Sequence, residues 1–357
     1  MVSKGNRGTK KIQPSFVKLN VKSMNSNNKN LNVLVTGGAG FIGSHLTDKL
    51  LVQGHHVTVL DNLVNGKEAN LNEAKRNANF KFIKGDILHA ETCVMATQNI
   101  DIVYHLACLG VRHSIHSPFE NHRVNAEGSL NMLEASRKNK VKRFFYISTS
   151  EIYGDIKEFP IDELGVPLPK TVYGASKLAG ENYAYSYFTC YGMDTTILRI
   201  FNNYGPRAHY EGDAGEIIPR SIVNLIYGNS PIIFGDGSVT RDFFFVKDTA
   251  HALTQLIDIN NITGEIINIG TGEEITMKHL LEKIVQLMQS NIKISYLEDR
   301  PADVPRLWVN PTKFRKITNF KSNYTFEDGL LETIKYYQEI SKGKNLLSEI
   351  TIKNWEK

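Results

Sequence analysis

The sequence VLVTGGAGFIGSH, residues 33–45, is the most informative part of the chain about its fold. Aliphatic and β-branched residues lead into Gly37, Gly40 and Gly43, and a helix-like segment comes next. In a strand–turn–helix unit of this kind, the first glycine allows the tight turn, the second lets the backbone approach a pyrophosphate, and the third permits close packing of the helix on the strand. The N–H groups that begin such a helix attract an anion. The stretch therefore predicts a dinucleotide-binding unit.

The same alternation of strand and helix continues to about residue 200. Apolar runs such as HHVTVLDN (55–62), DIVYHLA (101–107) and KRFFYISTS (142–150) are separated by longer helical segments. Continuous apolar strands between amphipathic helices indicate a parallel sheet that is covered on both faces. We therefore predict the α/β class, with a Rossmann-type doubly wound parallel sheet.

The composition changes after about residue 200, where Gly, Pro and aromatic residues crowd FNNYGPRAHYEGDAGEIIPR (201–220). This pattern indicates a second, loop-rich lobe placed against the first. We expect this smaller, interleaved C-terminal lobe to be the substrate-binding one. Thr325 and Asp328 have the spacing of a capping box before a last helix. We expect a disordered basic tail at 1–30, the dinucleotide-binding domain at 31–200 and about 240–262, the lobe at 201–239 and 263–345, and a tail at 346–357.

Charge and composition disfavour several kinds of partner. Of the 42 Lys and Arg residues, seven lie in residues 1–30, so the rest of the chain carries 35 basic against 37 acidic residues. This balance disfavours nucleic-acid binding, and no apolar run approaches the ~18 residues that a membrane helix needs. Cys93, Cys108 and Cys190 form no metal or redox pattern, which indicates buried thiols in a reducing compartment. We expect a cytoplasmic protein without a metal site.

Asp61 favours NAD over NADP as the cofactor. It ends the second predicted strand, 24 residues after Gly37. A carboxylate at this point is placed to accept hydrogen bonds from the adenosine ribose, and it would repel a 2′-phosphate.

Tyr173 and Lys177 form a candidate redox pair. They are four residues apart in VYGASKLAGENYAYSY (172–187), so they share one face of a predicted helix. A cationic amine and an oxidised nicotinamide beside the phenol would lower its pKa. Tyr173 would then take the proton of a sugar hydroxyl while hydride leaves the same carbon for NAD. Thr149 would bridge the two groups through its hydroxyl.

Taken together, these motifs resemble the extended short-chain dehydrogenase/reductase family, and specifically its nucleotide-sugar epimerases, dehydratases and decarboxylases. The resemblance covers about residues 32 to 340. It depends on the sequences TGGAGFIG, GDI (85–87), HLA (105–107), STSEIYG, YGASK, FNNYGPR, FGDG…RDF and RPADVP.

The resemblance implies roles for individual residues. The implied cofactor-binding residues are Gly37, Gly40, Phe41, Ile42, Gly43, Asp61, Asn62, Asp86, Ile87, Leu106, Ala107, Asn125, Tyr173 and Lys177. The implied substrate-binding residues are Arg112, His113, Ser150, Asn202, Arg241, Arg300 and Asp303, with Ser114 and His116 as further sugar-contact candidates. The arginines suit a diphosphate because their planar forks match phosphate geometry. The family also implies a homodimer formed through the helices near 120–138 and 173–190.

Glu151, in FFYISTSEIYGD (144–155), bears on the choice of reaction. All reactions of the group begin with oxidation at the sugar C4. A 4-epimerase returns the hydride to the other face, a dehydratase removes the C5 proton and loses water from C6, and a decarboxylase releases a C6 carboxylate as carbon dioxide. In an extended segment Glu151 would point the same way as Thr149, into a partly dry cleft that raises its pKa. Because dehydratases and decarboxylases resemble this Thr-Ser-Glu sequence, dehydratase-type elimination is the preferred prediction.

Other features keep alternatives open. Ser150 stands where dehydratases of thymidine diphosphate hexoses usually have Asp. GVRHS (110–114) and RPADVPRLW (300–308) look more like 4-epimerases of hexoses and uronates, and Arg112 could hold a C6 carboxylate. A UDP-glucose or UDP-glucuronate 4-epimerase, a UDP-glucuronate decarboxylase, and a non-catalytic protein that binds NAD and a nucleotide sugar are therefore the alternatives.

Overall fold

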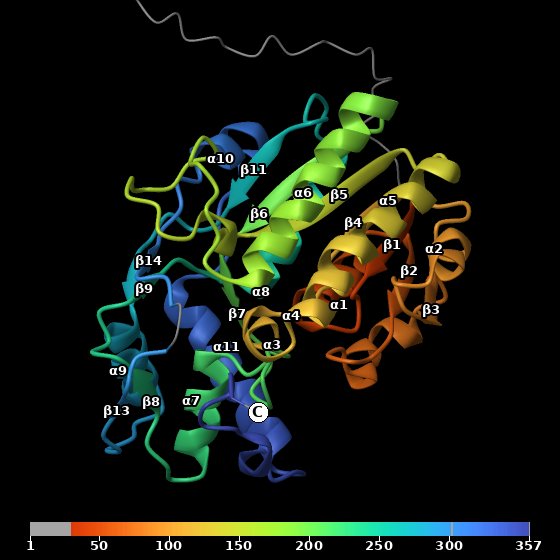
Figure 1. Ribbon diagram of the computed structural model, residues 1–357. Coiled ribbons are helices and arrows are strands. Elements are labelled where there is room, and N and C mark those ends of the chain that lie inside the picture. Colours follow the sequence, from red (N-terminus) through yellow and green to blue (C-terminus); the bar gives the residue numbers. More distant parts are fainter. Residues whose placement is uncertain (1–29, 301–302, 357) are drawn as a thin grey trace, which may run out of the picture.

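The computed structural model describes residues 30–300 and 303–356. Apart from Asn30, the predicted N-terminal tail lies outside these residues. The described chain forms a parallel sheet with helices on both faces, and a second group of short strands and helices lies beside it (Figure 1).

The central sheet has seven parallel strands in the order β11-β6-β5-β4-β1-β2-β3. In chain order they are β1 (Asn32–Thr36), β2 (His56–Asp61), β3 (Phe80–Lys84), β4 (Ile102–His105), β5 (Arg143–Thr149), β6 (Thr195–Ile200) and β11 (Ile266–Ile269). From β1 the chain builds outward first to β3 and then, from β4, in the opposite direction. The order therefore reverses between β1 and β4, where open sheets of this kind bind ligands beyond the carboxyl ends of the strands.

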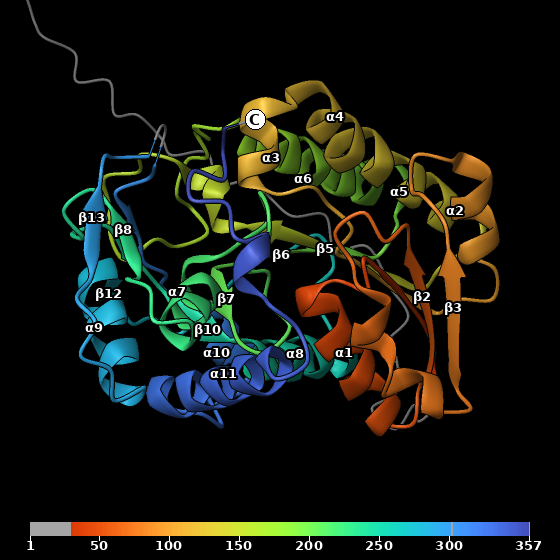
Figure 2. The same cartoon turned by 90° about the horizontal axis from the view of Figure 1, so that it is seen from below.

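Helices cover both faces of this sheet (Figure 2). On one face Val33 packs in a core with Leu46 and Leu253, from α1 (Phe41–Val52) and α8 (Val246–Gln255). On the other, Leu34 packs with helices α2 (Ala90–Ala96), α5 (Gly128–Lys138) and α6 (Val172–Tyr191). Successive strand residues point to opposite faces, which explains why the strand sequences are continuously apolar. The predicted Rossmann-type fold is confirmed.

The remaining elements of the first 200 residues are short. They are α3 (Val111–His116), α4 (Pro118–His122), a π-helical turn (Arg123–Glu127) and 3-10 turns at Glu68–Leu71, Ala74–Arg76 and Ser150–Tyr153.

The second group of elements has its own core, in which Tyr204, Phe243, Ile222 and Leu330 are buried. Its strands are β7 (Asn202–Tyr204) with β10 (Phe243–Phe245), β8 (Ile232–Phe234) with β13 (Ser295–Leu297), and β9 (Thr240–Arg241) between β12 (Ile275–Thr276) and β14 (Arg306–Leu307). Its helices are α7 (Ile217–Ile226), α9 (Met277–Leu287) and α11 (Phe326–Ser341). The predicted capping box is confirmed at the start of α11, where Thr325 and Asp328 each accept a hydrogen bond from the other's backbone N–H, at 3.1 and 3.0 Å.

The chain returns to the sheet within the range 263–345, which we expected to belong to the lobe. Strand β11 pairs with β6 there, and α10 (Thr312–Thr318) buries Phe314 in the core beneath the sheet. A 3-10 turn at Leu256–Asp258 precedes this return. We therefore place β11 and α10 with the sheet.

The expectation of a C-terminal tail at 346–357 is wrong for the residues described. After a 3-10 turn at Leu347–Glu349, the chain packs on the lobe, and Leu346, Asn354 and Trp355 are buried. The large apolar side chains of Leu346 and Trp355 explain this, since their burial offsets the entropy lost on ordering the chain.

The cysteine prediction is correct in part. Cys93 is buried, but Cys108 is half-buried and Cys190 is exposed near the end of α6. Among the described helices, none is long and apolar enough to cross a membrane.

Candidate functional site

A cavity of about 520 Å³ lies between the carboxyl edge of the sheet and the lobe. The sheet side contributes the turn after β1 and the ends of β2, β4, β5 and β6, and the lobe contributes residues of α7, β8, β9 and the segment around Arg300. With one exception, Asn125, the predicted catalytic, cofactor-binding and substrate-binding residues all line this cavity; Ser114 and His116, the further sugar-contact candidates, do not. The fold thus brings together residues that are far apart in the sequence.

The glycine turn after β1 has little room for side chains. Gly37 has a φ of +68°, and a Cβ there would lie 2.8 Å from the backbone nitrogen of Ala107. A Cβ on Gly43 would lie 2.3 Å from the carbonyl oxygen of Gly37, which explains the close packing of α1 on the turn. Gly40 is the N-cap of α1, no side chain caps the helix, and its first turn has no acidic residue. Residues 40–43 line the cavity, so the uncapped N–H groups at the start of α1 are the groups that could hold a pyrophosphate.

Asp61 is held at the end of β2 by two backbone hydrogen bonds. Its carboxylate accepts the N–H of Ala39 at 3.0 Å and that of Leu63 at 2.8 Å. Burial raises the pKa of this carboxyl group, and the two hydrogen bonds oppose the rise. A carboxylate has about four lone-pair sites, so acceptor capacity is left for the hydroxyls of a ribose. Nearby, Asn62 donates to Asp86 at 2.8 Å, which joins two more lining residues.

Tyr173, Thr149 and Lys177 all line the cavity, and the lowering of the Tyr173 pKa by Lys177 together with an oxidised nicotinamide stays a prediction. Burial and the neighbouring Cys108 raise the pKa of Tyr173 well above its ordinary value, and a hydrogen bond with Thr149 only partly offsets this. The ammonium of Lys177 donates to the carbonyl of Ile147 at 2.6 Å and lies 4.4 Å from the centroid of the Tyr146 ring. Burial also lowers the pKa of Lys177. The amine is thus bonded to β5 rather than to the phenol.

Asn125 does not line the cavity but is bonded to segments that do. It is fully buried in the π-helical turn, and its side chain both accepts the N–H of Leu109 at 2.8 Å and donates to the carbonyl of Leu109 at 3.0 Å. It also donates to Ser176, the neighbour of Lys177, at 3.0 Å. The prediction of direct cofactor contact is corrected: Asn125 fixes a lining segment and the α6 face.

Glu151 reaches the cavity by a geometry that the sequence did not predict. It lies in the 3-10 turn Ser150–Tyr153, not in an extended segment, and its backbone N–H donates to Thr149 at 3.2 Å. Burial raises the pKa of its carboxyl group, which Arg241 and Arg300 lower and Asp303 and Glu216 raise. Among the described residues, no hydrogen bond to this carboxylate is present. Glu151 is therefore a poorly solvated carboxyl group between the redox residues and the arginines.

Four arginines line the lobe side of the cavity: Arg112, Arg220, Arg241 and Arg300. Burial together with Arg112 and Arg300 lowers the pKa of Arg220 to about 10. Burial and Arg112 likewise lower the pKa of Arg300. Such mutual repulsion favours an anion at this point, and a diphosphate would relieve it. Sequence reasoning missed Arg220, although its place after Pro219 in the Gly- and Pro-rich segment was visible.

Two of the other arginines have carboxylate and carbonyl partners in the protein. Arg241 donates to Asp303 at 2.7 Å and to the carbonyl of Val304 at 2.7 Å, so two predicted substrate residues form an ion pair. Arg112 donates to the carbonyl of Asp213 at 2.6 Å and to Glu216 at 2.7 Å. These contacts occupy Nε and Nη2 of Arg112, which form one of the two forks that a guanidinium offers to a carboxylate.

The remaining predicted sugar contacts divide into two groups. His113, Ser150 and Asn202 line the cavity, and the side-chain oxygen of Asn202 is buried with no partner in the described chain. Ser114 and His116 do not line it: Ser114 donates to the carbonyl of Val111, and His116 contacts Asp213 at 2.8 Å. The prediction that Ser114 and His116 contact the sugar is therefore corrected: both are packing residues of α3.

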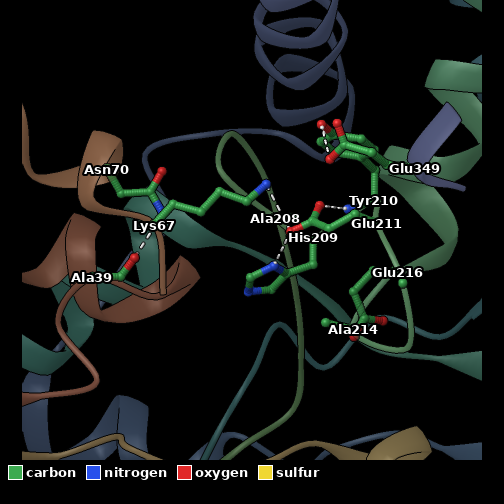
Figure 3. Close-up of polar contacts among 12 residues, drawn as sticks. Ala39, Lys67, Asn70, Ala208, His209, Tyr210, Glu211, Ala214, Glu216 and Glu349 are labelled. Carbon is green, nitrogen blue, oxygen red and sulfur yellow. Dashed lines mark hydrogen bonds and ion pairs between the residues drawn. The ribbon is translucent and has the colours of Figure 1, made fainter. Parts of the chain in front are cut away.

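Sequence reasoning also missed an ion pair between the loop after β2 and the lobe, Lys67 with Glu211, which we call the latch (Figure 3). The Lys67 ammonium lies 2.8 Å from the Glu211 carboxylate, which also contacts His209 at 2.8 Å. Although burial raises the pKa of Glu211, these two partners outweigh it and hold the pKa at about 2. Lys67 comes directly after the lining residues 64–66, and His209 lines the cavity itself. Lys67 and Glu211 lie in loops far apart in the sequence, so no local sequence pattern predicts that they form an ion pair.

Comparison with known proteins agrees with this geometry. The family model described as GDP-mannose 4,6 dehydratase matches residues 34–333. A UDP-N-acetyl-alpha-D-glucosaminuronate decarboxylase of Bacillus cytotoxicus is 34% identical, with 86% of this chain and 98% of the relative covered. The structure of a UDP-N-acetylglucosamine 4-epimerase from Methanobrevibacter ruminantium has a TM-score of 0.83 at 34% identity, over 88% of this chain and 100% of that one. A dTDP-glucose 4,6-dehydratase from Streptomyces venezuelae, crystallised with NAD, has a TM-score of 0.83 at 29% identity, over 87% and 98%.

Relatives with three different reactions thus share this fold and length. The chain therefore belongs to the GDP-mannose 4,6-dehydratase family, in the extended short-chain dehydrogenase/reductase group of NAD-dependent enzymes that modify nucleotide sugars.

Proposed function

We propose that the protein binds NAD and a nucleotide-diphosphate sugar in the one cavity and oxidises the sugar at C4. The start of α1 would hold the pyrophosphate of NAD and Asp61 its adenosine ribose. Bound there, NAD supplies the acceptor for a hydride. Tyr173 takes the proton of the C4 hydroxyl, Thr149 hydrogen-bonds both groups, and Lys177 fixes the end of β5 against α6. The arginines hold the diphosphate of the sugar nucleotide.

The finer reaction that we propose is a dehydratase-type elimination, and Glu151 is the residue that supports this choice. The ketone at C4 acidifies the C5 proton, Glu151 removes that proton, and the C6 hydroxyl leaves as water with the proton that Glu151 returns. A carboxyl group whose pKa is raised by burial suits this exchange at neutral pH. Hydride would then return to C6, and C5 would take up one proton, which balances the proton that Tyr173 removed from the C4 hydroxyl.

A second candidate is a 4-epimerase. It is favoured by the sequences GVRHS (110–114) and RPADVPRLW (300–308), which look more like those of 4-epimerases, and by the presence of a 4-epimerase among the similar structures. This reaction needs the same redox residues but no proton exchange at C5. The occupied guanidinium of Arg112 gives less support to a decarboxylase, because Nε and Nη2 are bonded to Asp213 and Glu216.

Product masses distinguish the candidates. The purified protein with NAD is incubated with UDP-, TDP- and GDP-linked hexoses, amino sugars and uronates. Loss of water supports the elimination. An unchanged mass with altered retention would mean that the reaction is an epimerisation, and loss of carbon dioxide that it is a decarboxylation. Binding without conversion across the whole panel would instead favour a non-catalytic binding protein.

We also propose a homodimer through α4, α5 and α6. Helices α4 and α6 expose large aromatic side chains: Phe119 is 87% exposed, Tyr191 58% and Tyr185 43%. Large apolar side chains that are exposed on neighbouring helices are candidates for an association surface. Light scattering on the wild type and on Phe119→Glu tests this, since a dimer should dissociate in the variant and a monomeric wild type contradicts the proposal.

A further inference from the structure

The last residues of the chain lie beyond the family match, which ends at residue 333. We call residues 344–356 the C-terminal strap. In both Figure 1 and Figure 2 the end of the chain lies close to α3, the helix that carries Arg112 and His113. The first residues of the strap are bonded to Tyr227, whose hydroxyl donates to the carbonyl of Lys344 at 2.9 Å and accepts the N–H of Leu346 at 3.1 Å.

The strap holds the loop 208–216, which contributes several residues to the cavity lining. The carbonyl of Glu349 accepts the N–H of Gly212 at 3.1 Å, and its carboxylate meets the hydroxyl of Tyr210 at 3.2 Å (Figure 3). Asn354 donates to the carbonyls of Gly212 and Gly215, at 3.3 and 3.0 Å. These bonds fix the loop whose carbonyls at 213 and 214 orient Arg112.

The strap also holds Arg220 directly. Nη2 of Arg220 donates to the carbonyls of Thr351 and Ile352, at 2.6 and 2.8 Å. Its Nε is buried and has no partner in the described part of the chain. Nη2 of the guanidinium is therefore occupied by the strap, Nε has no competing partner among the described residues, and Arg220 lines the cavity.

Trp355 holds a second arginine by aromatic contact. Its ring packs edge-on against Phe234, with centroids 4.7 Å apart and an interplanar angle of 79°. The guanidinium carbon of Arg300 lies 5.5 Å from the centroid of Trp355 and 5.6 Å from that of Phe234. Nε of Arg300 is buried and unpaired among the described residues. The two rings thus form a platform that holds a cation whose charge is still available to an anion.

We propose that the C-terminal strap is part of the nucleotide-sugar site, with Trp355 as the positioning residue for Arg300 and the carbonyls of Thr351 and Ile352 as those for Arg220. The inference depends on the proposed function in one respect, namely that a nucleoside diphosphate occupies the arginine side of the cavity. It adds that this chain completes the site with residues outside the region that the family model matches. The strap contacts the loop that orients Arg112, and it also contacts the guanidinium groups of Arg220 and Arg300. A C-terminal segment that only lay on the surface would not contact all three.

Binding of free UDP, TDP and GDP, measured by calorimetry, tests the proposal. Trp355→Ala should raise the dissociation constant of the nucleotide that the wild type binds best by about tenfold, the loss expected for a desolvated cation–π platform. Trp355→Phe keeps a ring and should restore binding to within about threefold of the wild type. NAD affinity should stay unchanged in both variants, because Trp355 does not line the cavity beside the glycine turn. With a converted sugar nucleotide, KM should rise much more than kcat falls.

A spectroscopic arm keeps the test independent of folding defects. The chain has two tryptophans, so Trp308→Phe leaves Trp355 as the one reporter. Titration with the nucleotide should change its emission. If the wild type binds none of the three nucleotides, the proposed function fails; if it binds one but Trp355→Ala binds equally well, or Trp355 emission stays constant, the strap inference is wrong while the proposed function stands.

Discussion

The cofactor side and the substrate side of the cavity are built in different ways. On the cofactor side, one continuous segment, 33–45, forms the strand, the turn and the helix start, and its backbone supplies the anion-binding groups. On the substrate side, four arginines come from four separate segments, and each guanidinium is oriented by a partner far away in the sequence. The first side should therefore tolerate change in distant residues, whereas the second depends on packing that extends to the end of the chain.

Tyr173→Phe should have the largest effect on turnover. The proposed proton transfer takes place at this phenol, between the NAD bound on one side of the cavity and the sugar bound on the other. Turnover should fall by about 10²- to 10⁴-fold, the range that a positioned acid–base group contributes. The phenylalanine ring keeps the packing, so the affinities for NAD and nucleotide should change little. Steady-state turnover and calorimetric binding measure the two. If the variant keeps more than about a tenth of the wild-type turnover, the loss is smaller than a positioned acid–base group contributes, and another group takes the proton.

Glu151→Gln should separate the redox step from the elimination. Elimination should fall by about 100-fold or more, while NADH absorbance still appears on addition of substrate. Because burial raises the pKa of Glu151 above 4.5, wild-type elimination should decline as the pH falls through a value above 4.5, where the carboxylate becomes protonated and no longer accepts the C5 proton. The exposed Glu158 lies outside the cavity lining and gives the matched control, Glu158→Gln. Unchanged product formation in Glu151→Gln would remove the argument for a dehydratase.

Gly43→Ala should break the cofactor side alone. A Cβ at Gly43 would lie 2.3 Å from the carbonyl of Gly37, so α1 must move away from the turn, at a cost of about 1–3 kcal/mol of unfolding free energy. If the displaced helix start loses a comparable amount of pyrophosphate binding, NAD affinity should fall by about tenfold or more, while the affinity for the nucleoside diphosphate changes little. Gly343→Ala is the control, since a Cβ there meets no atom within 4 Å. Equal losses for both ligands would mean that the two sides are not separable.

The same difference explains how much could be predicted from the sequence. The sheet, the glycine turn, Asp61 and the Tyr173–Lys177 pair could be predicted from strand periodicity and local spacing, and the structure places the last three at the cavity. The roles of Arg220 and Trp355 could not be predicted from local spacing, because they depend on which distant carbonyls and rings the fold brings near them. The prediction for Asn125 was wrong for a related reason, since a family motif marks a position but not whether its side chain faces the ligand or the layer beneath.

Lys67→Ala should give the smallest effect, because it weakens the latch between the two sides without touching either ligand site directly. The Lys67 side chain is 41% exposed, so the ion pair with Glu211 should contribute about 1 kcal/mol or less to the unfolding free energy. NAD should dissociate a few times faster, as the loop that holds residues 64–66 against the cavity loosens. Lys75→Ala, which removes a surface pair between a lysine of similar exposure and Glu68, is the control.

The pH dependence of this latch has a definite sign. Glu211 has a pKa of about 2 in the fold and an ordinary value of 4.5, so it binds fewer protons when folded. Its contribution to stability is therefore fully present above its ordinary pKa of 4.5 and is lost as the pH falls toward 2. Urea unfolding of the wild type and Lys67→Ala should differ most at neutral pH and converge in acid. A constant difference from neutral pH down to about pH 3 would mean that Lys67 acts through packing on Tyr210, whose ring centroid lies 4.8 Å from its ammonium, and not through Glu211.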